Sequence, residues 1–387
     1  MEKLIIQTEK MIASGLCIAH VNGKTVFVSG TLPDEELSVK IISSKKDYDN
    51  AVIDKILKAS VHRIKPLCPY FGKCGGCNLS FAAPEYQKRL RKEILFDSFV
   101  RAFNQKKLDF PFNLDDIEYI GDSPYGYRNR FQLHDGCFFE NKSNIKVPVK
   151  NCLIAYKNIN DFLNSEKPWE KEQYKGRIQI FASDKLTEKK VHLAGKETSS
   201  DEENKVTVKL AGKYISFDNR GFFQSNLNVL EKVLPVLTEN LSGKHLLDIY
   251  CGTGTLSAFT DSKFEKYSLV EYNAKALKYA KENLKFENVT SYALTGEKYI
   301  NGLINKLYPG DFDAVIADPP RSGMEKAVSD YLCQNKVPLI RSLSCDPVTH
   351  ARDMAKLVSS GYKLKRLILC DFYPQSSHIE SLAFLEL

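Results

Sequence analysis

No stretch of this sequence is apolar for long enough to cross a membrane, because a spanning helix needs about 20 largely apolar residues. The pattern of a secretory signal peptide is also missing, since charged residues flank the very short apolar run of the opening MEKLIIQTEK. We therefore expect a cytoplasmic protein without a membrane segment. Its 387 residues, of which 43% are hydrophobic and 27% charged, suffice for two or three globular domains.

A disulfide scaffold is not expected from the ten cysteines, because clustered thiols without a secretory signal are more often metal ligands or catalytic groups. Cys68, Cys74 and Cys77 form a C-x5-C-x2-C pattern, and Cys152 is a candidate fourth ligand. Four thiolates suit either zinc or a [4Fe–4S] cluster. Zinc sites more often pair two short knuckles, so three clustered cysteines and a remote one favour the iron–sulfur cluster.

Apolar spacing divides the chain into three parts with boundaries at 1–60, 61–220 and 221–387. The first part has short alternating runs broken by glycine and proline, which suggest a small OB-like β-barrel. The second contains the cysteine-rich loop, an amphipathic helix at 84–103 that we allow to pack on the third part, and then mainly β-type pattern. In the third, strands and helices alternate, which predicts an α/β domain with a parallel, Rossmann-like sheet. Its expected strands lie at 245–250, 267–272, 313–318, 338–344 and 364–373, with helices at 273–286 and 347–360.

A glycine-rich loop follows the first expected strand of the third part. In LLDIYCGTGTLS, Gly252 and Gly254 let the backbone approach a ligand at the carboxyl end of the sheet. Glu271 ends the next strand, where a carboxylate can accept hydrogen bonds from ribose hydroxyls. The loop lacks the third glycine of a dinucleotide site, with Ser257 in its place, and the chain lacks a P-loop. These absences favour a nucleoside without a pyrophosphate, of which S-adenosylmethionine is the common example.

The loop DPPRSG follows another strongly apolar strand. Asp318 at the strand end can accept hydrogen bonds from the cofactor or from a base, and the two prolines stiffen the loop. Amino-group methylases of nucleobases tend to carry an aromatic residue after the two prolines, and here that residue is Arg321. The loop also has no cysteine, which another class of RNA methylases places there.

Cys345, in SLSCDPVTHARD, stands just past a strand and ahead of a helix, at the sheet edge that carries the cofactor loop. C5 of uracil is a poor nucleophile, and attack of a thiolate on C6 makes C5 reactive enough to take a methyl group. The C5 proton must then leave before the thiol is released, which requires a general base. Glu380, in YPQSSHIESLAF, is the candidate for that base. The remaining cysteines outside the metal cluster are interpreted as packing residues.

Together these segments resemble the RNA uracil-C5 methyltransferase family: GFFQSN, LDIYCGTGTLS, DPPRSG, SCDPVTHARD and YPQSSHIES stand in the family's order along most of the chain. The resemblance implies Cys345 as nucleophile and Glu380 as base. The resemblance also implies that Phe222 stacks on the flipped uracil. One departure is Ser377, where members often have a second histidine. The residues that the resemblance implies for binding S-adenosylmethionine are Gln224, Tyr250, Glu271 and Asp318.

The first part resembles a TRAM domain, an RNA-binding barrel, and the cysteine pattern with Cys152 resembles that of the [4Fe–4S] members of the family. TRAM domain, cluster and methylase together are most similar to the 23S rRNA enzymes, so we expect a monomer acting on structured RNA, with rRNA preferred over tRNA. A net charge of +7 is compatible with such a polyanion without requiring it. The alternatives are a tRNA uridine methylase, a cytosine-C5 methylase, and an iron–sulfur RNA-binding protein without catalysis.

Overall fold

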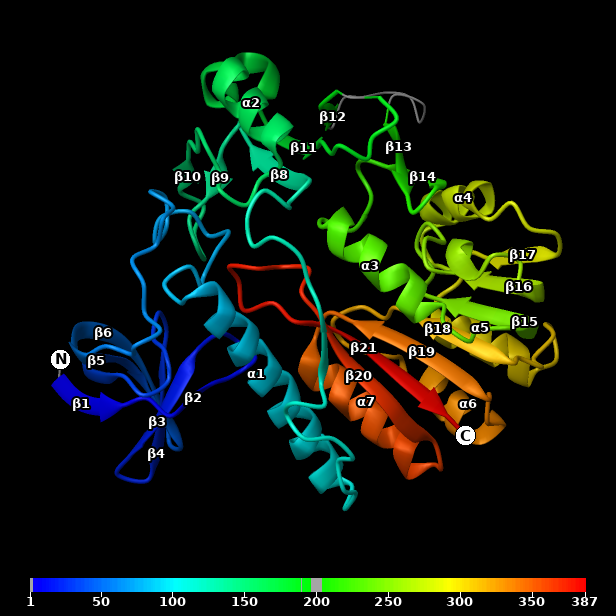
Figure 1. Ribbon diagram of the computed structural model, residues 1–387, viewed down its shortest axis with the longest axis horizontal. Coiled ribbons are helices and arrows are strands. Elements are labelled where there is room, and N and C mark those ends of the chain that lie inside the picture. The colour runs from blue at the N-terminus through cyan, green and yellow to red at the C-terminus, as the bar shows by residue number, and fades with distance from the viewer. Residues whose placement is uncertain (1–2, 189, 196–203) are drawn as a thin grey trace.

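The computed structural model describes residues 3–188, 190–195 and 204–387. A β-barrel-like part lies at one end of the molecule and an α/β part at the other, and a smaller mixed part lies at the top of the view, above the helix α1 (Pro84–Gln105) that runs between the two ends (Figure 1). This arrangement agrees with the fold class expected from the sequence.

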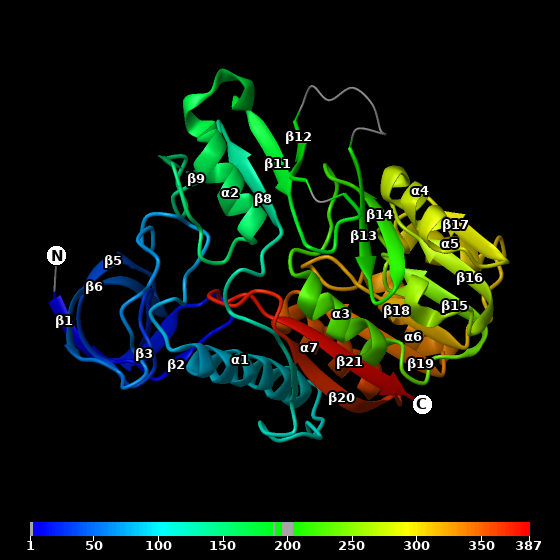
Figure 2. The ribbon, with the colours of Figure 1, turned by 45° about the horizontal axis from the view of Figure 1, so that its top comes forward.

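The N-terminal part is one six-stranded sheet in the order β1-β5-β6-β4-β3-β2. The sheet curls around a single apolar core that includes Val26, Leu37 and Val39 (Figure 2). A two-residue turn joins β3 to β4, and its residues Asn22 and Gly23 both have positive φ, 49° and 78°, as such hairpins require. The strands are β1 (Lys3–Gln7), β2 (Lys10–Met11), β3 (Cys17–Val21), β4 (Lys24–Val28), β5 (Glu36–Ser44) and β6 (Tyr48–Lys58).

The middle part consists of small sheets and a short helix around their own core, which includes Phe131, Ile159 and Ile180. Strand β8 pairs with β11, β11 with β12, and β9 with β10, all antiparallel. The elements are β8 (Arg130–His134), β9 (Phe138–Phe139), β10 (Lys146–Val147), α2 (Lys157–Glu166), η1 (Pro168–Glu170), η2 (Glu172–Tyr174), β11 (Arg177–Phe181) and β12 (His192–Ala194).

The C-terminal part is built on an eight-stranded sheet in the order β17-β16-β15-β18-β19-β21-β20-β7. Strands from β17 to β19 are parallel, while β21 runs antiparallel to both of its neighbours. The edge strand β7 comes from the segment before the middle part and pairs with β20. The strands are β7 (Glu118–Ile120), β15 (Gly243–Ile249), β16 (Phe264–Val270), β17 (Val289–Tyr292), β18 (Ala314–Ala317), β19 (Leu339–Ser344), β20 (Lys363–Cys370) and β21 (Glu380–Glu386).

Helices cover both faces of this sheet, because its strands are apolar on both sides. On β15, for example, Leu247 and Ile249 join one core and Leu246 the other. Helices α3 and α4 and the hairpin β13–β14 lie on one face, and α5, α6, α7 and α1 on the other, with α1 packed against α7. The elements are α1 (Pro84–Gln105), β13 (Lys205–Leu210), β14 (Lys213–Asp218), α3 (Leu227–Leu237), η3 (Ser257–Thr260), α4 (Ala274–Asn283), α5 (Gly296–Ile304), α6 (Lys326–Asn335) and α7 (Pro347–Ser359).

Candidate active site

The candidate site lies where the strand order of the sheet reverses. Strand β15 has β16 on one side and β18 on the other, so the loops after β15 and β18 lead away in opposite directions and leave a crevice. Tyr250 follows β15 directly and Asp318 follows β18 directly. Glu271 follows β16. These three residues therefore meet at the carboxyl edge of the sheet.

The loop after β15 has a backbone that requires its glycines. Gly252 and Gly254 have φ values of 53° and 70°, and a Cβ at Gly254 would lie 2.6 Å from Leu284 Cδ1. Glu271 holds this loop, since its two carboxylate oxygens accept the backbone N–H groups of Gly252 at 3.1 Å and Asn273 at 2.8 Å. The Tyr250 hydroxyl accepts the N–H of Glu325 at 3.2 Å. Contacts within the protein thus fix the shape of the loop.

Three carboxyl groups gather under this loop. Asp248, on β15, is 1% exposed, and its Oδ1 has no hydrogen-bond partner, while Ser257 donates to Oδ2. Burial, with a smaller effect of Glu271, raises the pKa of Asp248 to about 7. Burial and the charges of Asp248 and Glu271 also raise the pKa of Asp318 to about 7. A site in which carboxylates repel one another favours a cationic ligand.

Replacing Asp248 by asparagine is expected to stabilise the ligand-free protein at neutral pH. A carboxyl with a raised pKa binds its proton more tightly in the folded state, so wild-type stability falls as pH rises from about 4 to about 7. The asparagine variant lacks that slope, and its gain at pH 7 is at most about 4 kcal/mol. Urea denaturation of both proteins between pH 4 and pH 8 measures the difference. Equal slopes in the two proteins would contradict the raised pKa.

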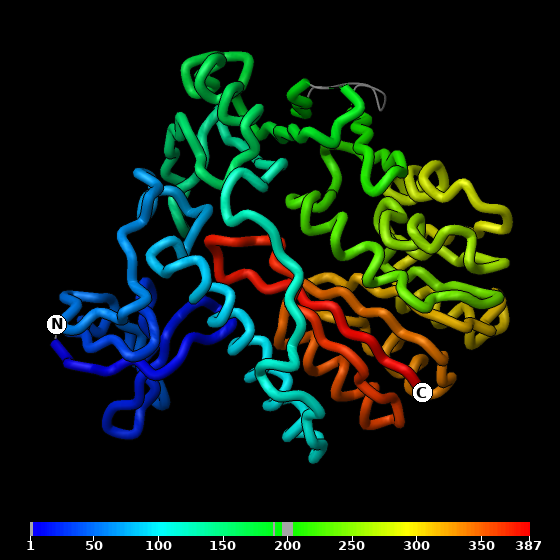
Figure 3. The backbone as a smooth tube through the Cα atoms, viewed as in Figure 1, coloured from blue at the N-terminus to red at the C-terminus, as the bar shows by residue number. Residues whose placement is uncertain are grey.

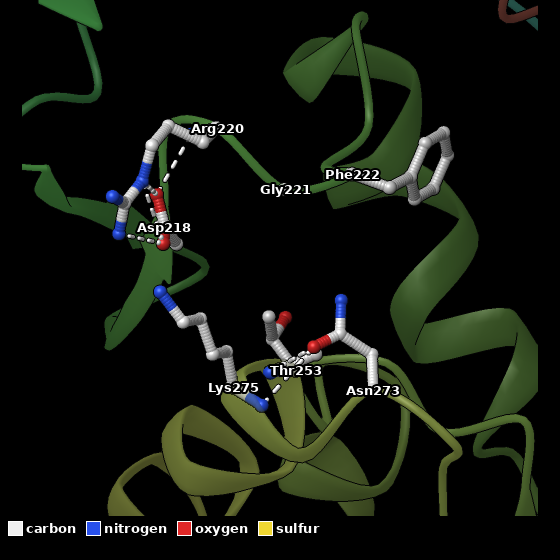
Figure 4. A pocket seen from close by; sticks show the side chains of 8 residues that line it. Asp218, Arg220, Gly221, Phe222, Thr253, Asn273 and Lys275 are labelled. Carbon is white, nitrogen blue, oxygen red and sulfur yellow. Dashed lines mark hydrogen bonds and ion pairs between the residues drawn. The ribbon is translucent and has the colours of Figure 1, made fainter. Parts of the chain in front are cut away.

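A pocket of about 290 Å³ opens beside the cofactor loop. In it, Asp218 forms an ion pair with Arg220 at 2.7 Å, and the Arg220 and Phe222 side chains diverge on either side of Gly221 (Figure 4). The Phe222 ring is 69% exposed, so a flat ligand has access to its face. The pocket is lined by Asp218, Arg220, Gly221, Phe222, Thr253, Asn273, Lys275 and Ala276.

Gln224 lies two residues beyond Phe222 and is 8% exposed. Its side-chain oxygen Oε1 is buried without a hydrogen-bond partner. A buried amide oxygen without a donor is costly, so the position suits a ligand N–H group. The orphaned oxygen, the carboxyl groups and the preformed loop fit a nucleoside that carries positive charge, as S-adenosylmethionine does.

Cys345 and Glu380 are brought together by the pairing of β19 with β21. These strands are antiparallel, with Ser344 opposite Ser381, so Cys345 and Glu380 are the next two residues along the pair. Cys345 is partly exposed, whereas Glu380 is only 3% exposed. Helix α7 begins two residues after Cys345, capped by Asp346, whose Oδ1 accepts the N–H of Val348 at 3.0 Å. The two residues expected to act as nucleophile and base are therefore neighbours, 35 positions apart in the chain.

Burial, together with neighbouring carboxylates, favours the protonated forms of Cys345 and Glu380. Burial, Glu380 and Asp318 raise the pKa of Cys345 to about 11, and Arg321 acts in the opposite direction. Burial and the charge of Asp318 hold the pKa of Glu380 well above its usual range, again against Arg321. A cation bound next to Asp318 would lower both pKa values and so favour release of the protons.

The local sequence pattern predicts neither a role for Asp248 nor an effect of Arg321 on the pKa values of Cys345 and Glu380. Asp248 is a carboxylate within the apolar run LLDIY. An ionisable residue inside a buried strand is costly, so its presence there is a sequence signal of a functional residue. Arg321 was noted only because it is not aromatic. Its exposed guanidinium lowers the pKa of both Cys345 and Glu380, which became evident only from the spatial arrangement.

The four cysteines expected to bind metal lie close to one another, although Cys152 is 75 residues beyond Cys77 in the sequence. Cys68, Cys74 and Cys152 all contribute to raising the pKa of the Cys77 thiol to about 12, after the larger effect of burial. All four are free and partly buried. Among the described residues, however, no three His, Cys, Asp or Glu side chains are arranged to hold a metal ion. The iron–sulfur site stays a prediction.

Two family models together match most of this chain. The model of the tRNA (Uracil-5-)-methyltransferase family matches residues 153–387, and the TRAM domain model matches residues 4–62. This chain belongs to the tRNA (Uracil-5-)-methyltransferase family. The enzyme is an S-adenosylmethionine-dependent RNA uracil-C5 methyltransferase, as the resemblance of its motifs implied. Within the part of the chain that the structure describes, no helix is long and apolar enough to cross a membrane.

Relatives match the enzyme over nearly its whole length. An uncharacterized RNA methyltransferase of Treponema denticola is 38% identical, covering 99% of this chain and 98% of its own. A 23S rRNA (uracil(1939)-C(5))-methyltransferase RlmD of Mannheimia succiniciproducens is 26% identical, covering 96% and 93%. The solved structure of the Pyrococcus abyssi tRNA (uracil-54, C5)-methyltransferase with S-adenosyl-L-homocysteine has a TM-score of 0.72 at 19% identity, covering 99% of this chain and 100% of its own. That structure shares the fold of this enzyme.

Proposed function

We propose that this enzyme methylates C5 of a uridine in 23S rRNA through a covalent bond between Cys345 and C6 of the base. The observation that carries the mechanism is the apposition of Cys345 and Glu380 across β19 and β21, at the edge where the cofactor crevice opens. A thiol and a carboxyl side by side provide the nucleophile and the base that the reaction needs.

The reaction begins when the Cys345 thiolate adds to C6 and its electron pair makes C5 carbanion-like. When bound, S-adenosylmethionine would supply an electrophilic methyl group to C5, and the bond to its sulfonium sulfur would break so that neutral S-adenosylhomocysteine leaves. The Glu380 carboxylate then removes the C5 proton, and the electrons of that C–H bond re-form the C5–C6 double bond as the bond between C6 and Cys345 Sγ breaks. Cys345 is thereby restored as a thiolate, and Glu380 carries the proton to solvent.

Gln224, Tyr250, Glu271 and Asp318 are the residues we assign to the cofactor. Asp318 and Gln224 offer a carboxylate and an orphaned amide oxygen to the cofactor's cationic and N–H groups. Glu271 shapes the loop and stands where ribose hydroxyls are bound in this fold. Tyr250, with its positive φ of 65°, turns the chain out of β15 toward the crevice.

Phe222 is assigned to the substrate base. Its exposed ring lines the pocket, and aromatic side chains commonly stack on unpaired RNA bases. The target uridine must leave its stack to bring C5 and C6 to Cys345, and stacking on Phe222 would compensate for that cost.

The choice of 23S rRNA over tRNA rests on the relatives. The RlmD enzyme aligns with 96% of this chain, and the TRAM domain model matches residues 4–62. The test uses purified enzyme with unmodified 23S rRNA and tRNA transcripts, followed by mapping of 5-methyluridine. We expect the modification in 23S rRNA. Product in tRNA alone would support the tRNA alternative, and no product in either RNA would refute the proposal.

We also propose that Cys68, Cys74, Cys77 and Cys152 hold a [4Fe–4S] cluster. Four thiols within one partly buried site repel one another as thiolates, and a cationic centre would relieve that repulsion. Methyl transfer needs no electrons from a cluster. The cluster would therefore have a structural role and stabilise the cysteine-rich loop.

A Cys152→Ser variant, purified without exposure to oxygen, is expected to lose most of the iron and acid-labile sulfide that wild type retains. Serine removes one of four ligands, which reduces metal affinity strongly. Cys333→Ser is the matched control, because Cys333 is also a partly buried free thiol but lies on α6. Equal iron content in all three proteins, including an absence of iron from all of them, would contradict the cluster assignment.

A further inference from the structure

The loop between β20 and β21, residues 371–379, carries the chain into Glu380 and is held by residues from the N-terminal half. In Figure 3 this red loop lies beside the light-blue and cyan chain of the cysteine segment and α1 (Figure 3). The contacts are hydrogen bonds between residues almost 300 positions apart. None of these N-terminal residues has a part in the reaction described above.

Gln375 is the centre of the contact. It is 2% exposed and has a φ of 70°, a left-handed conformation that is unfavourable for a residue with a side chain. Gln87 of α1 stabilises it with two bonds: its Oε1 accepts the Gln375 N–H at 2.9 Å, and its Nε2 donates to Gln375 Oε1 at 3.2 Å. The Gln375 carbonyl accepts the N–H groups of Asn78 at 3.2 Å and Leu79 at 3.0 Å. The strained residue is thus fixed on three sides.

Ser377 is held in the same way by Asn78, the residue directly after Cys77. Asn78 Nδ2 donates to Ser377 Oγ at 2.9 Å, and Asn78 Oδ1 accepts the Ser377 N–H at 2.8 Å. The TRAM barrel closes the remaining side, since a Cβ at Gly15 would lie 2.6 Å from Ser377 Oγ. At the position where family members often have a second histidine, this chain therefore has a serine in a tight polar contact.

A buried ion pair anchors the beginning of the loop. Arg91, one turn beyond Gln87 on α1, lies 2.6 Å from Asp371 Oδ2 and donates to the Ser376 carbonyl at 3.0 Å. Both partners of the pair are at most 4% exposed. The loop from Asp371 to Ser377 is therefore clamped along its length, and Glu380 follows three residues later.

We propose that Gln87 and Asn78 are positioning residues for Glu380, which fix the loop and so place the carboxylate against the substrate. This role rests on the proposed function of Glu380 as base. It also gives the cysteine segment a task in catalysis that needs no electron transfer, because Asn78 connects that segment to the base-bearing loop.

A displaced base has a specific kinetic consequence. Attack by Cys345 and methyl transfer do not use Glu380, whereas release of the methylated RNA does. Misplacing a catalytic group by about 1 Å can cost about 100-fold in rate. Loss of the clamp should therefore slow product release and leave the RNA covalently bound to Cys345.

The experiment compares Gln87→Leu, Asn78→Ala and the control Phe103→Leu in the full-length enzyme. Phe103 is also buried on α1, 16 residues beyond Gln87, and its ring stacks on Phe99. A 23S rRNA transcript and a tRNA mixture serve as probes, and covalent protein–RNA complex is measured on denaturing gels alongside turnover. Glu380→Gln provides the reference for complete loss of the base. Binding of S-adenosylmethionine to each variant reports that its catalytic domain is folded.

We expect Gln87→Leu and Asn78→Ala to lower kcat about 10-fold to 100-fold and to accumulate covalent complex, while Phe103→Leu does not accumulate it. A loss of activity without accumulated complex, or complex in Phe103→Leu as well, would overturn the positioning role. A lack of complex in Glu380→Gln itself would instead refute the base assignment and, with it, this inference. If Gln87→Leu fails to fold, the result for Asn78→Ala tests the positioning role. Asn78 is exposed, so its replacement by alanine is not expected to prevent folding.

Discussion

Replacing Cys345 by alanine is expected to abolish RNA methylation, with a fall in turnover of at least about 10⁴-fold. Without a thiolate at C6, C5 of uracil does not become nucleophilic, and neither the cofactor nor Glu380 can supply that activation. The measurement is transfer of labelled methyl from S-adenosylmethionine to RNA. Binding of the cofactor should remain close to wild type, because Cys345 is not among the residues assigned to it.

The matched control is Cys333→Ala. Cys333 is likewise a partly buried free thiol, and its contact is with the Lys356 carbonyl on α7, away from the crevice. It should retain nearly full activity. If Cys345→Ala kept full methylation of RNA, the covalent mechanism would be wrong, whatever the result for Cys333.

Replacing Glu380 by glutamine is expected to lower product formation about 10³-fold and to trap RNA on the enzyme. Glutamine keeps the size of the side chain, but its amide cannot take the C5 proton, so the bond between C6 and Cys345 persists. Covalent complex resistant to denaturation should form in proportion to methyl transferred, and a second substitution, Cys345→Ala, should abolish it.

Glu386→Gln is the control for this variant, because Glu386 ends the same strand β21 at its other end, opposite Leu339. It should leave turnover and the amount of complex unchanged. An unchanged product yield in Glu380→Gln would refute the assignment of Glu380 as base. The assignment of Cys345 as nucleophile would not be affected, because the Cys345→Ala variant tests it separately.

The spacing of apolar residues and the helix-capping residues predicted those strands and helices whose limits depend only on neighbouring residues. Strand Gly243–Ile249 and helix Pro347–Ser359 lie within two residues of their expected limits, because apolar period and helix capping are properties of short segments. The expected helix at 84–103 extends to Gln105. The order of the motifs likewise sufficed to predict the family, since each motif is contiguous in the chain.

Polar residues that act from a distance were harder to predict. An apolar strand pattern gives no sign that the single carboxylate of Asp248 matters, because its raised pKa depends on burial beside Glu271. The strand β7 was placed with the middle part, yet it pairs with β20, more than 240 residues further along the chain. A three-residue segment has too little local pattern to reveal such a partner.

Three features therefore follow from the sequence alone: the types of residues at the site, the glycines of the cofactor loop, and the alternation of strands and helices. Local sterics and the spacing of apolar residues dictate them. The register that sets Cys345 beside Glu380 and the left-handed Gln375 held by Gln87 do not follow from it. Both depend on contacts between distant segments, whose free energy comes from packing and hydrogen bonds that exist only once the whole domain is folded.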